Sequence, residues 1–362
     1  MRTALLVAVA ALSGCSGFFC TRAQTSQPLP LAWPEADALF TGDARFLGAD
    51  SAYSVSLGDD RVLWLFGDTF VALDDARSRR HAKMVRNSIA VEAGLDPAKA
   101  TIRFLQGGTD QVPSSFFSEP GSTDESKAWR WPGTPALVDG KLLLFFWDMK
   151  ASETPGAFGF TLDHTSAVVV DNPLDDPSTW RAHDVPLPAL SALPGGGGHG
   201  IALGTGAAFV DGDVVRFLAA REPGDHEMFA AHVSVHDAAH GDLSHLVVDG
   251  DAGFTGATEL SLSKSGDTYV VVVADGFGAA HVDMRTAPSP AGPWSAPTLV
   301  YAPPEGAKPN ALVYSAKAHP ELTAPHGELV ATYCTNNTDL GTLVDDMSIY
   351  FPRFVRVVPS PR

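Results

Sequence analysis

Two aspartates, Asp50 and Asp68, are the residues whose type and spacing most clearly suggest chemistry. They flank a stretch in which apolar residues first alternate with serines and then run almost continuously through residues 62–66. Alternation indicates a half-buried strand, and the apolar run indicates a strand covered on both faces. Residues 58–60 (Gly-Asp-Asp) supply a turn between the two strands. Because the first strand of a hairpin begins beside the end of the second, we expect these two carboxyl groups to lie side by side.

A pair of carboxyl groups in a cleft can perform glycoside hydrolysis, in which one acid protonates the leaving oxygen and the other acts as base or nucleophile. Glu259, at the start of a later apolar strand, is a third catalytic candidate, because partial burial would raise its pKa. Simpler roles stay open for these acids. Asp68 follows Gly67 and could only cap a turn, and Glu259 could be a structural hydrogen-bond acceptor.

Further polar and aromatic residues fall where they could contact a sugar. Trp131 offers a flat stacking face, while cationic side chains could position hydroxyl groups or tune the acids. Glu321 could instead only brace the site, and a surface arginine is more often merely solvated. The predicted substrate-binding residues are Arg86, Asn87, Trp131, Lys317, His319, Glu321, Asn336 and Arg353.

One hairpin pattern recurs five times and would position these residues. A short alternating strand, a turn and a strong apolar run occur in each of the segments 52–66, 136–147, 207–218, 260–274 and 318–333. Sheet units that repeat at intervals of about 50 to 80 residues indicate an all-β, five-bladed β-propeller, here over residues 40–358. A two-sheet sandwich is the alternative. In a propeller, the starts of the first strands and the ends of the second strands meet at one mouth of the central channel. The predicted starts are Asp50, Trp131, Thr205, Glu259 and 317–319. The predicted ends are Asp68, Asp148, Arg221, Asp275 and Asn336.

Composition narrows the possible partners. The 362 residues carry a net charge of −17, which argues against nucleic acid as a partner. The sequence lacks a phosphate-binding Walker loop, a nucleophile elbow and a zinc-protease motif, so we predict no cofactor and no metal centre. An ion in the channel, held by His164, His199 and His319, stays open. The glycine-rich segment 195–200 is interpreted as a loop between blades. We expect a monomer.

The N-terminal residues resemble an export signal. Arg2 precedes a short apolar run, and Leu12-Ser13-Gly14-Cys15 matches the lipobox of bacterial lipoproteins. We therefore expect residues 1–15 to be a signal peptide, Cys15 to be lipidated, and residues 16–39 to form a flexible tether to the cell envelope. A plain secretory signal is the alternative. Cys20 and Cys334 are interpreted as free thiols, although an oxidising compartment would allow them to pair.

Several motifs together resemble a known family. They are Asp50 with residues 65–69 (Leu-Phe-Gly-Asp-Thr), 86–88 (Arg-Asn-Ser), 131–133 (Trp-Pro-Gly), 314–317 (Tyr-Ser-Ala-Lys) and 350–353 (Tyr-Phe-Pro-Arg). They resemble the bacterial five-bladed propeller family that includes the endo-D-arabinanases, over roughly residues 40–358. The resemblance implies a glycoside hydrolase whose two first-blade aspartates match Asp50 and Asp68. It also implies an arabinan substrate, such as that of mycobacterial cell walls.

The leading hypothesis is therefore an envelope lipoprotein that hydrolyses a cell-wall or environmental polysaccharide. The first alternative is a lipoprotein that binds glycan at the same mouth without cleaving it. A structural scaffold is the third possibility.

Overall fold

The structure is a computed structural model that describes residues 31–152, 159–187, 200–222, 224–276, 278 and 280–357. The predicted all-β class is confirmed, because five four-stranded antiparallel sheets follow one another along the chain. The first contains β3 (Tyr53–Gly58), β4 (Arg61–Phe66), β7 (Ser88–Ala93) and β8 (Thr101–Leu105). The second contains β11 (Ala128–Val138), β12 (Lys141–Ala151), β13 (Phe160–Val170) and β14 (Ala182–Val185).

The remaining three sheets have the same antiparallel design. The third contains β15 (Gly200–Asp211), β16 (Val214–Glu222), β17 (Glu227–Ser234) and β18 (Val247–Thr255). The fourth contains β19 (Leu260–Ser265), β20 (Thr268–Ala274), β21 (Val282–Ala287) and β22 (Thr298–Tyr301). The fifth contains β23 (Ala311–Ala318), β24 (Leu329–Asn337), β25 (Arg353–Val357) and β1 (Leu31–Ala32).

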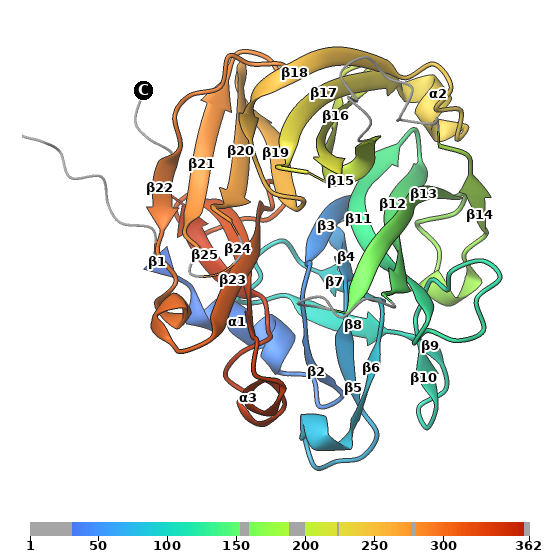
Figure 1. The fold of residues 1–362 in the computed structure, drawn as a ribbon, viewed down its shortest axis with the longest axis vertical. Helices are drawn as coiled ribbons and strands as arrows, with labels where there is room; N and C mark the ends of the chain where they lie inside the picture. Colours follow the sequence, from blue (N-terminus) through green and yellow to red (C-terminus); the bar gives the residue numbers. More distant parts are fainter. Residues whose placement is uncertain are drawn as a thin grey trace, which may run out of the picture.

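The first strand of each sheet lies toward the centre of the molecule (Figure 1). Contacts run from β3 to β11, from β11 to β15, from β15 to β19 and from β19 to β23. Between the fifth and first sheets, Ser315 Oγ and Lys317 Nζ donate hydrogen bonds of 2.9 and 2.6 Å to the main-chain oxygen of Ser51. Polar groups distant in the chain are thereby gathered near the centre.

The five predicted hairpins are all present, with some different bounds. The first and fourth match the prediction closely. The second and third are longer, because each of their inner strands continues through an irregularity in register. The fifth begins at Ala311, so Lys317 lies near the end of β23 rather than at its start. The cause is a long connection, residues 319–328, between β23 and β24.

The tether predicted for residues 16–39 is wrong from Leu31 onward. Strand β1 pairs with β25, and helix α1 (Pro34–Thr41) follows. Proline fits the first turn of a helix, and Ala36, Leu39 and Phe40 are spaced to form one buried face. The ring of Phe40 packs 5.0 Å from that of Trp64 in the first sheet. Residues 1–30, including Cys15 and Cys20, lie outside the described residues.

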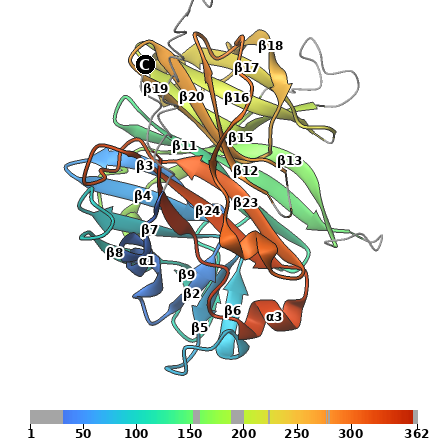
Figure 2. The same cartoon turned by 90° about the vertical axis from the view of Figure 1, so that its left-hand side faces the viewer.

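Smaller elements complete the fold. Strands β2 (Phe46–Ala49), β5 (Thr69–Ala72) and β6 (Ala82–Val85) form a three-stranded sheet at one end of the molecule (Figure 2). Strands β9 (Gly107–Gly108) and β10 (Pro113–Ser114) form a small hairpin, and the short helices are α2 (Val235–Ala239), α3 (Leu340–Asp345), η1 (Arg79–His81), η2 (Pro177–Thr179) and η4 (Pro304–Ala307). Within the described ranges, no helix is long and apolar enough to cross a membrane.

The core lies between neighbouring sheets. Between the second and third sheets, for example, the ring of Phe145 packs edge-on against that of Phe217 at 5.5 Å. Burial of such large apolar side chains is the main driving force for folding. Cys334 is a buried free thiol within the cluster between the fifth and first sheets.

Candidate active site

Asp50 and Asp68 lie opposite each other where the first hairpin bends. On one side of the bend, β3 pairs with β4. On the other side, β2, which precedes β3 in the chain, pairs with β5, which follows β4, and Ala49 lies opposite Thr69. Across the bend, the main-chain oxygen of Asp50 accepts a 3.2 Å hydrogen bond from the amide of Gly67. The predicted neighbourhood of the two aspartates is therefore confirmed.

The bend requires unusual backbone geometry. Ser51 and Ala52 have φ angles of 64° and 51°, which non-glycine residues adopt rarely and at a cost. On the facing strand, a Cβ atom on Gly67 would lie only 2.4 Å from Asp50 Oδ1. Glycine at position 67 is therefore needed for the strand to approach the Asp50 carboxyl group this closely.

Asp50 is surrounded by phenol groups and negative charge. The hydroxyl groups of Tyr314 and Tyr350 donate to Asp50 Oδ2 at 2.7 and 3.3 Å. Burial, together with the negative charges of Asp68 and Glu259, raises the pKa of Asp50 to about 8, despite these two hydrogen bonds. At neutral pH the Asp50 carboxyl group is therefore mostly protonated.

Asp68 has different partners. Arg86 Nη1 lies 3.1 Å from Asp68 Oδ2, and the indole Nε1 of Trp131 donates to Oδ1 at 2.7 Å. Burial raises the pKa of Asp68, whereas the Arg86 guanidinium and the Trp131 indole oppose this shift. The phenol of Tyr350, which bonds Asp50, also donates to the main-chain oxygen of Asp68 at 3.1 Å. One tyrosine thus links the two acids.

Glu259 lies close to this pair and is paired with a lysine. Lys317 Nζ is 3.1 Å from Glu259 Oε1 and 4.1 Å from the centre of the Tyr53 ring. The Glu259 charge contributes to the raised pKa of Asp50, so this carboxylate belongs to the same electrostatic cluster. Lys317 is only 2% exposed. Its ammonium group is engaged with protein groups, and its predicted role in binding substrate stays a prediction.

His319 and Glu321 lie in the contact between the first and fifth sheets. Both contact the hydroxyl of Ser54, and His319 Nε2 lies 2.7 Å from the hydroxyl of Thr332. His319 is 1% exposed, and burial with the nearby Lys317 charge lowers its pKa to about 3. This neutral imidazole is enclosed by protein, and the substrate-binding role predicted for His319 stays a prediction. Glu321 has a pKa raised by burial and bonds Ser54, which fits the bracing role.

The other predicted contacts divide into two groups. Arg86 and Trp131 bond Asp68, and Asn336 Nδ2 lies 3.4 Å from the hydroxyl of Tyr314. Asn87 and Arg353 instead have structural partners, and their predicted roles in binding substrate stay predictions. Buried Asn87 bonds the backbone of residues 117 and 130, and Arg353 pairs with Asp37 of α1 at 3.1 Å.

Tyr314 and Tyr350 lie at the acid pair but were not predicted to be functional residues. Both belong to motifs that carry the family resemblance, but neither has a sequence signal that places its hydroxyl near Asp50. Tyr314 lies beside an irregularity in β23, and Tyr350 has a φ of 64°. Buried Arg79 holds the segment that ends at Tyr350 through hydrogen bonds to the main-chain oxygens of Leu343, Asp346 and Ile349. It also donates to the main-chain oxygen of Leu47 in β2.

Two of the histidines suggested for a channel ion, His164 and His319, have different surroundings. His164 lies beside Asp163 and Asp148 of the second sheet, whereas His319 bonds Ser54 and Thr332. His199 lies outside the described residues. Among the residues that the structure describes, one group has a spacing that could hold a metal ion, namely Asp237, Asp242 and His245. It lies at the surface near α2, apart from the acid pair.

Comparison with known proteins identifies the family. A family model described as "Domain of unknown function (DUF5005)" matches residues 35–185 and 244–359. The chain therefore belongs to this family. The residues between the two matched ranges, 186–243, contain most of the third sheet. No curated protein matches the sequence significantly.

The chain is similar to several solved structures at low sequence identity, and the first of them shares the fold. A presumed hydrolase from Bacteroides ovatus has a TM-score of 0.66 and 18% identity, covering 91% of this chain and 90% of its own. An exo-β-1,3-galactanase variant from Phanerochaete chrysosporium has a TM-score of 0.49 and 14% identity over 85% of this chain and 59% of its own. An endo-arabinase from Bacteroides thetaiotaomicron has a TM-score of 0.47 and 13% identity over 87% of this chain and 95% of its own.

Proposed function

We propose that this protein is a glycoside hydrolase in which Asp50 and Asp68 form the acid/base pair. The observation that carries the proposal is the different environment of two neighbouring carboxyl groups. Asp50 is held mostly protonated by burial and negative charge, whereas Asp68 faces a guanidinium and an indole donor. Two adjacent acids with different environments are the usual basis for assigning a proton donor and a base.

The chemistry follows from these protonation states. Asp50 donates its proton to the leaving glycosidic oxygen, while the Asp68 carboxylate acts as base or nucleophile. Tyr350 holds Asp50 through its side chain and Asp68 through its backbone, so it fixes their relative positions. Glu259, held by Lys317, contributes negative charge that keeps Asp50 protonated.

We also infer that the five four-stranded sheets are the blades of a propeller and that the acids open onto its mouth. Trp131, which is partly exposed beside Asp68, is the proposed stacking platform for a sugar ring. A cell-wall or environmental polysaccharide, such as an arabinan, is the proposed substrate. The shared fold with the presumed hydrolase from Bacteroides ovatus is compatible with this proposal.

The test is hydrolysis of a panel of plant and bacterial cell-wall polysaccharides by the purified soluble protein, followed by product chromatography. Asp50→Asn and Asp68→Asn should each abolish product release while circular dichroism and thermal unfolding show a folded protein. Asp59→Asn is the matched control, because Asp59 is an exposed turn residue of the same hairpin. Full activity in both site variants would refute the assignment.

Non-catalytic glycan binding is the second candidate. The observation that favours it is the ion pair of Asp68 with Arg86, in which the Asp68 side chain is only 15% exposed. If this pair persists with ligand, Asp68 is not available as a base. Glycan binding that survives in the Asp50→Asn and Asp68→Asn variants, without turnover by the wild type, would support this function.

We further propose that the protein is exported and anchored to the envelope through a lipid on Cys15. Replacement of Cys15 by Ala should then move the protein from the membrane fraction to the soluble fraction. Unchanged membrane association of this variant would contradict the anchor.

A further inference from the structure

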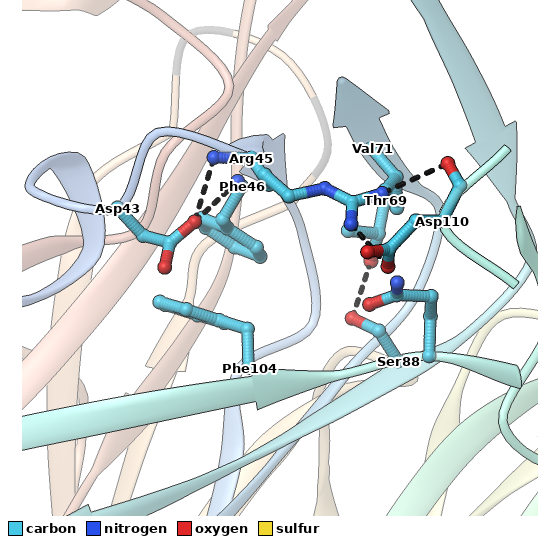
Figure 3. A pocket seen from close by; sticks show the side chains of 9 residues that line it. Asp43, Arg45, Phe46, Thr69, Val71, Ser88, Phe104 and Asp110 are labelled. Carbon is cyan, nitrogen blue, oxygen red and sulfur yellow. Dashed lines mark hydrogen bonds and ion pairs between the residues drawn. The ribbon is translucent and has the colours of Figure 1, made fainter. Parts of the chain in front are cut away.

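A pocket lies behind the acid pair, between the three-stranded sheet and the first four-stranded sheet. Its volume is about 150 Å³, and neither Asp50 nor Asp68 lines it. Figure 3 shows its lining, to which β2, β5, β7 and β8 contribute. The nine lining residues are Asp43, Arg45, Phe46, Thr69, Val71, Ser88, Phe104, Gln106 and Asp110.

We propose that this pocket binds one neutral sugar ring, at a site separate from the mouth that carries the acids. A protein cavity of about 150 Å³ holds a single benzene-sized ring. The pocket is therefore of the size of one ring rather than of two.

The walls combine an apolar surface with polar groups. The rings of Phe46 and Phe104 stack at 4.0 Å and form an aromatic wall. The hydroxyl groups of Thr69 and Ser88 lie 2.8 Å apart on the opposite side (Figure 3). Aromatic rings bind the apolar C–H face of a sugar. The oxygens of Thr69 and Ser88 can accept hydrogen bonds from its hydroxyls, because Thr69 already donates to Gly67 and Ser88 donates to Thr69.

Gln106 provides an uncommitted polar group in the lining. Within the described part of the chain, its amide makes no hydrogen bond. Asp43 uses Oδ1 to accept hydrogen bonds from the amides of Arg45 and Phe46, at 2.7 and 2.9 Å. An amide and a carboxylate at the same pocket can serve the donor and acceptor sides of vicinal sugar hydroxyls.

Charge selects a neutral ligand over an acidic one. The lining contains two carboxylates, Asp43 and Asp110, and one guanidinium, that of Arg45. The guanidinium is already paired with Asp110 and donates to the main-chain oxygen of Asp110 at 3.0 Å. The lining therefore has a net negative charge and no unpaired cation, so a phosphorylated or uronic-acid ligand is disfavoured.

The pocket is connected to the acid pair through one hydroxyl. Thr69 Oγ1, at the pocket wall, donates to the main-chain oxygen of Gly67 at 2.8 Å. Gly67 directly precedes Asp68 and contacts Asp50 from the facing strand. A sugar that bonds Thr69 would therefore contact the backbone segment that positions both acids.

The experiment measures binding of methyl glycosides by saturation-transfer NMR. It uses the Asp50→Asn/Asp68→Asn variant, so that binding is measured without hydrolysis. The probes are the methyl glycosides of arabinose, galactose, xylose and glucose, with methyl glucuronoside as the acidic counterpart. At least one neutral probe should bind saturably, and Gln106→Ala should weaken it about tenfold through the lost hydrogen bond. Gln111→Ala is the matched control, because Gln111 is exposed on the adjacent hairpin and does not line the pocket.

Three results would overturn the proposal: no saturable binding of any neutral probe, equal binding by the wild-type and Gln106→Ala pockets, or preference for the glucuronoside. Ser88→Ala provides a second test. Loss of this hydroxyl should also weaken binding of the neutral methyl glycoside, with an unchanged unfolding temperature. Failure of the proposed hydrolysis would leave these measurements unaffected, because they use a variant without the two acids.

Discussion

The hydroxyl of Tyr314 donates a 2.7 Å hydrogen bond to Asp50 Oδ2 across a separation of 264 residues in the chain. This contact joins the first strand of the fifth sheet to the bend of the first hairpin. A donor at this position favours the ionised carboxylate and opposes the burial that raises the pKa of Asp50. Tyr314 therefore limits how far the acid is held in its protonated form.

Removal of this donor should move the pH dependence of the reaction. In Tyr314→Phe, the pKa of Asp50 should rise above its present value of about 8, because the ionised form loses a hydrogen bond. The alkaline limb of the kcat/KM profile should shift to higher pH. The measurement is the rate of polysaccharide hydrolysis as a function of pH. An alkaline limb that stays in place would show that Asp50 is not the titrating acid.

Asp50→Asn should stabilise the protein while abolishing its activity. The pKa of Asp50 in the folded state, about 8, lies above its value in the unfolded state. Between about pH 4 and pH 8, the folded state therefore binds a proton that the unfolded state has lost. The free energy of unfolding falls as the pH rises through this range. Asparagine has no such proton to lose, so the variant should gain about 1–3 kcal/mol in free energy of unfolding at the alkaline end.

Urea unfolding at a series of pH values tests this expectation. The difference between Asp50→Asn and the wild type should be smallest near pH 4 and should grow until about pH 8. The turn variant Asp59→Asn should show no such pH-dependent difference. A constant offset for Asp50→Asn across this range would argue against a raised pKa.

Arg86→Gln should affect the second acid. The guanidinium of Arg86 lowers the pKa of Asp68, in opposition to burial, and its loss should raise that pKa further. The acidic limb of the kcat/KM profile should then move to higher pH, with a loss of about 10–100-fold in kcat. Pre-steady-state and steady-state hydrolysis across pH would measure both effects. Arg61→Gln, in the same sheet but paired with the main chain of Leu174, provides the control.

Lys317→Met should destabilise the fold. It removes the partner of Glu259 and the hydrogen bond to the Ser51 carbonyl, in a place where the ammonium group is buried. We expect a loss of about 2–4 kcal/mol in free energy of unfolding. The added replacement Glu259→Gln should restore part of this loss, which a double-mutant cycle by urea unfolding would measure.

Lys264→Met supplies the matched comparison for this lysine. Lys264 pairs with Asp211 in a partly exposed position, so its loss should cost much less free energy of unfolding than the loss of Lys317. Equal costs at positions 264 and 317 would show that the buried pair has no special structural role.

Features that depend on residues close together in the sequence were predicted well, and features that depend on tertiary packing were not. The first hairpin and the neighbourhood of Asp50 and Asp68 were predictable, because alternation and a turn act within about twenty residues. Helix α1 was underestimated, since a helix of eight residues is stabilised mainly by packing, here of Phe40 on Trp64. The positions of Lys317 and His319 were misjudged, because β23 begins at Ala311 and these residues lie near its end rather than at its start.

The sequence by itself determined the all-β class, the repeated hairpins and the placement of two aspartates at the ends of paired strands. These features follow from residue periodicity and turn chemistry, which are local. Only the tertiary structure decided which carboxyl group is protonated, which cations are buried and that Tyr314 and Tyr350 contact Asp50. Burial and charge at a site depend on residues that are distant in the chain and become neighbours only when the sheets assemble.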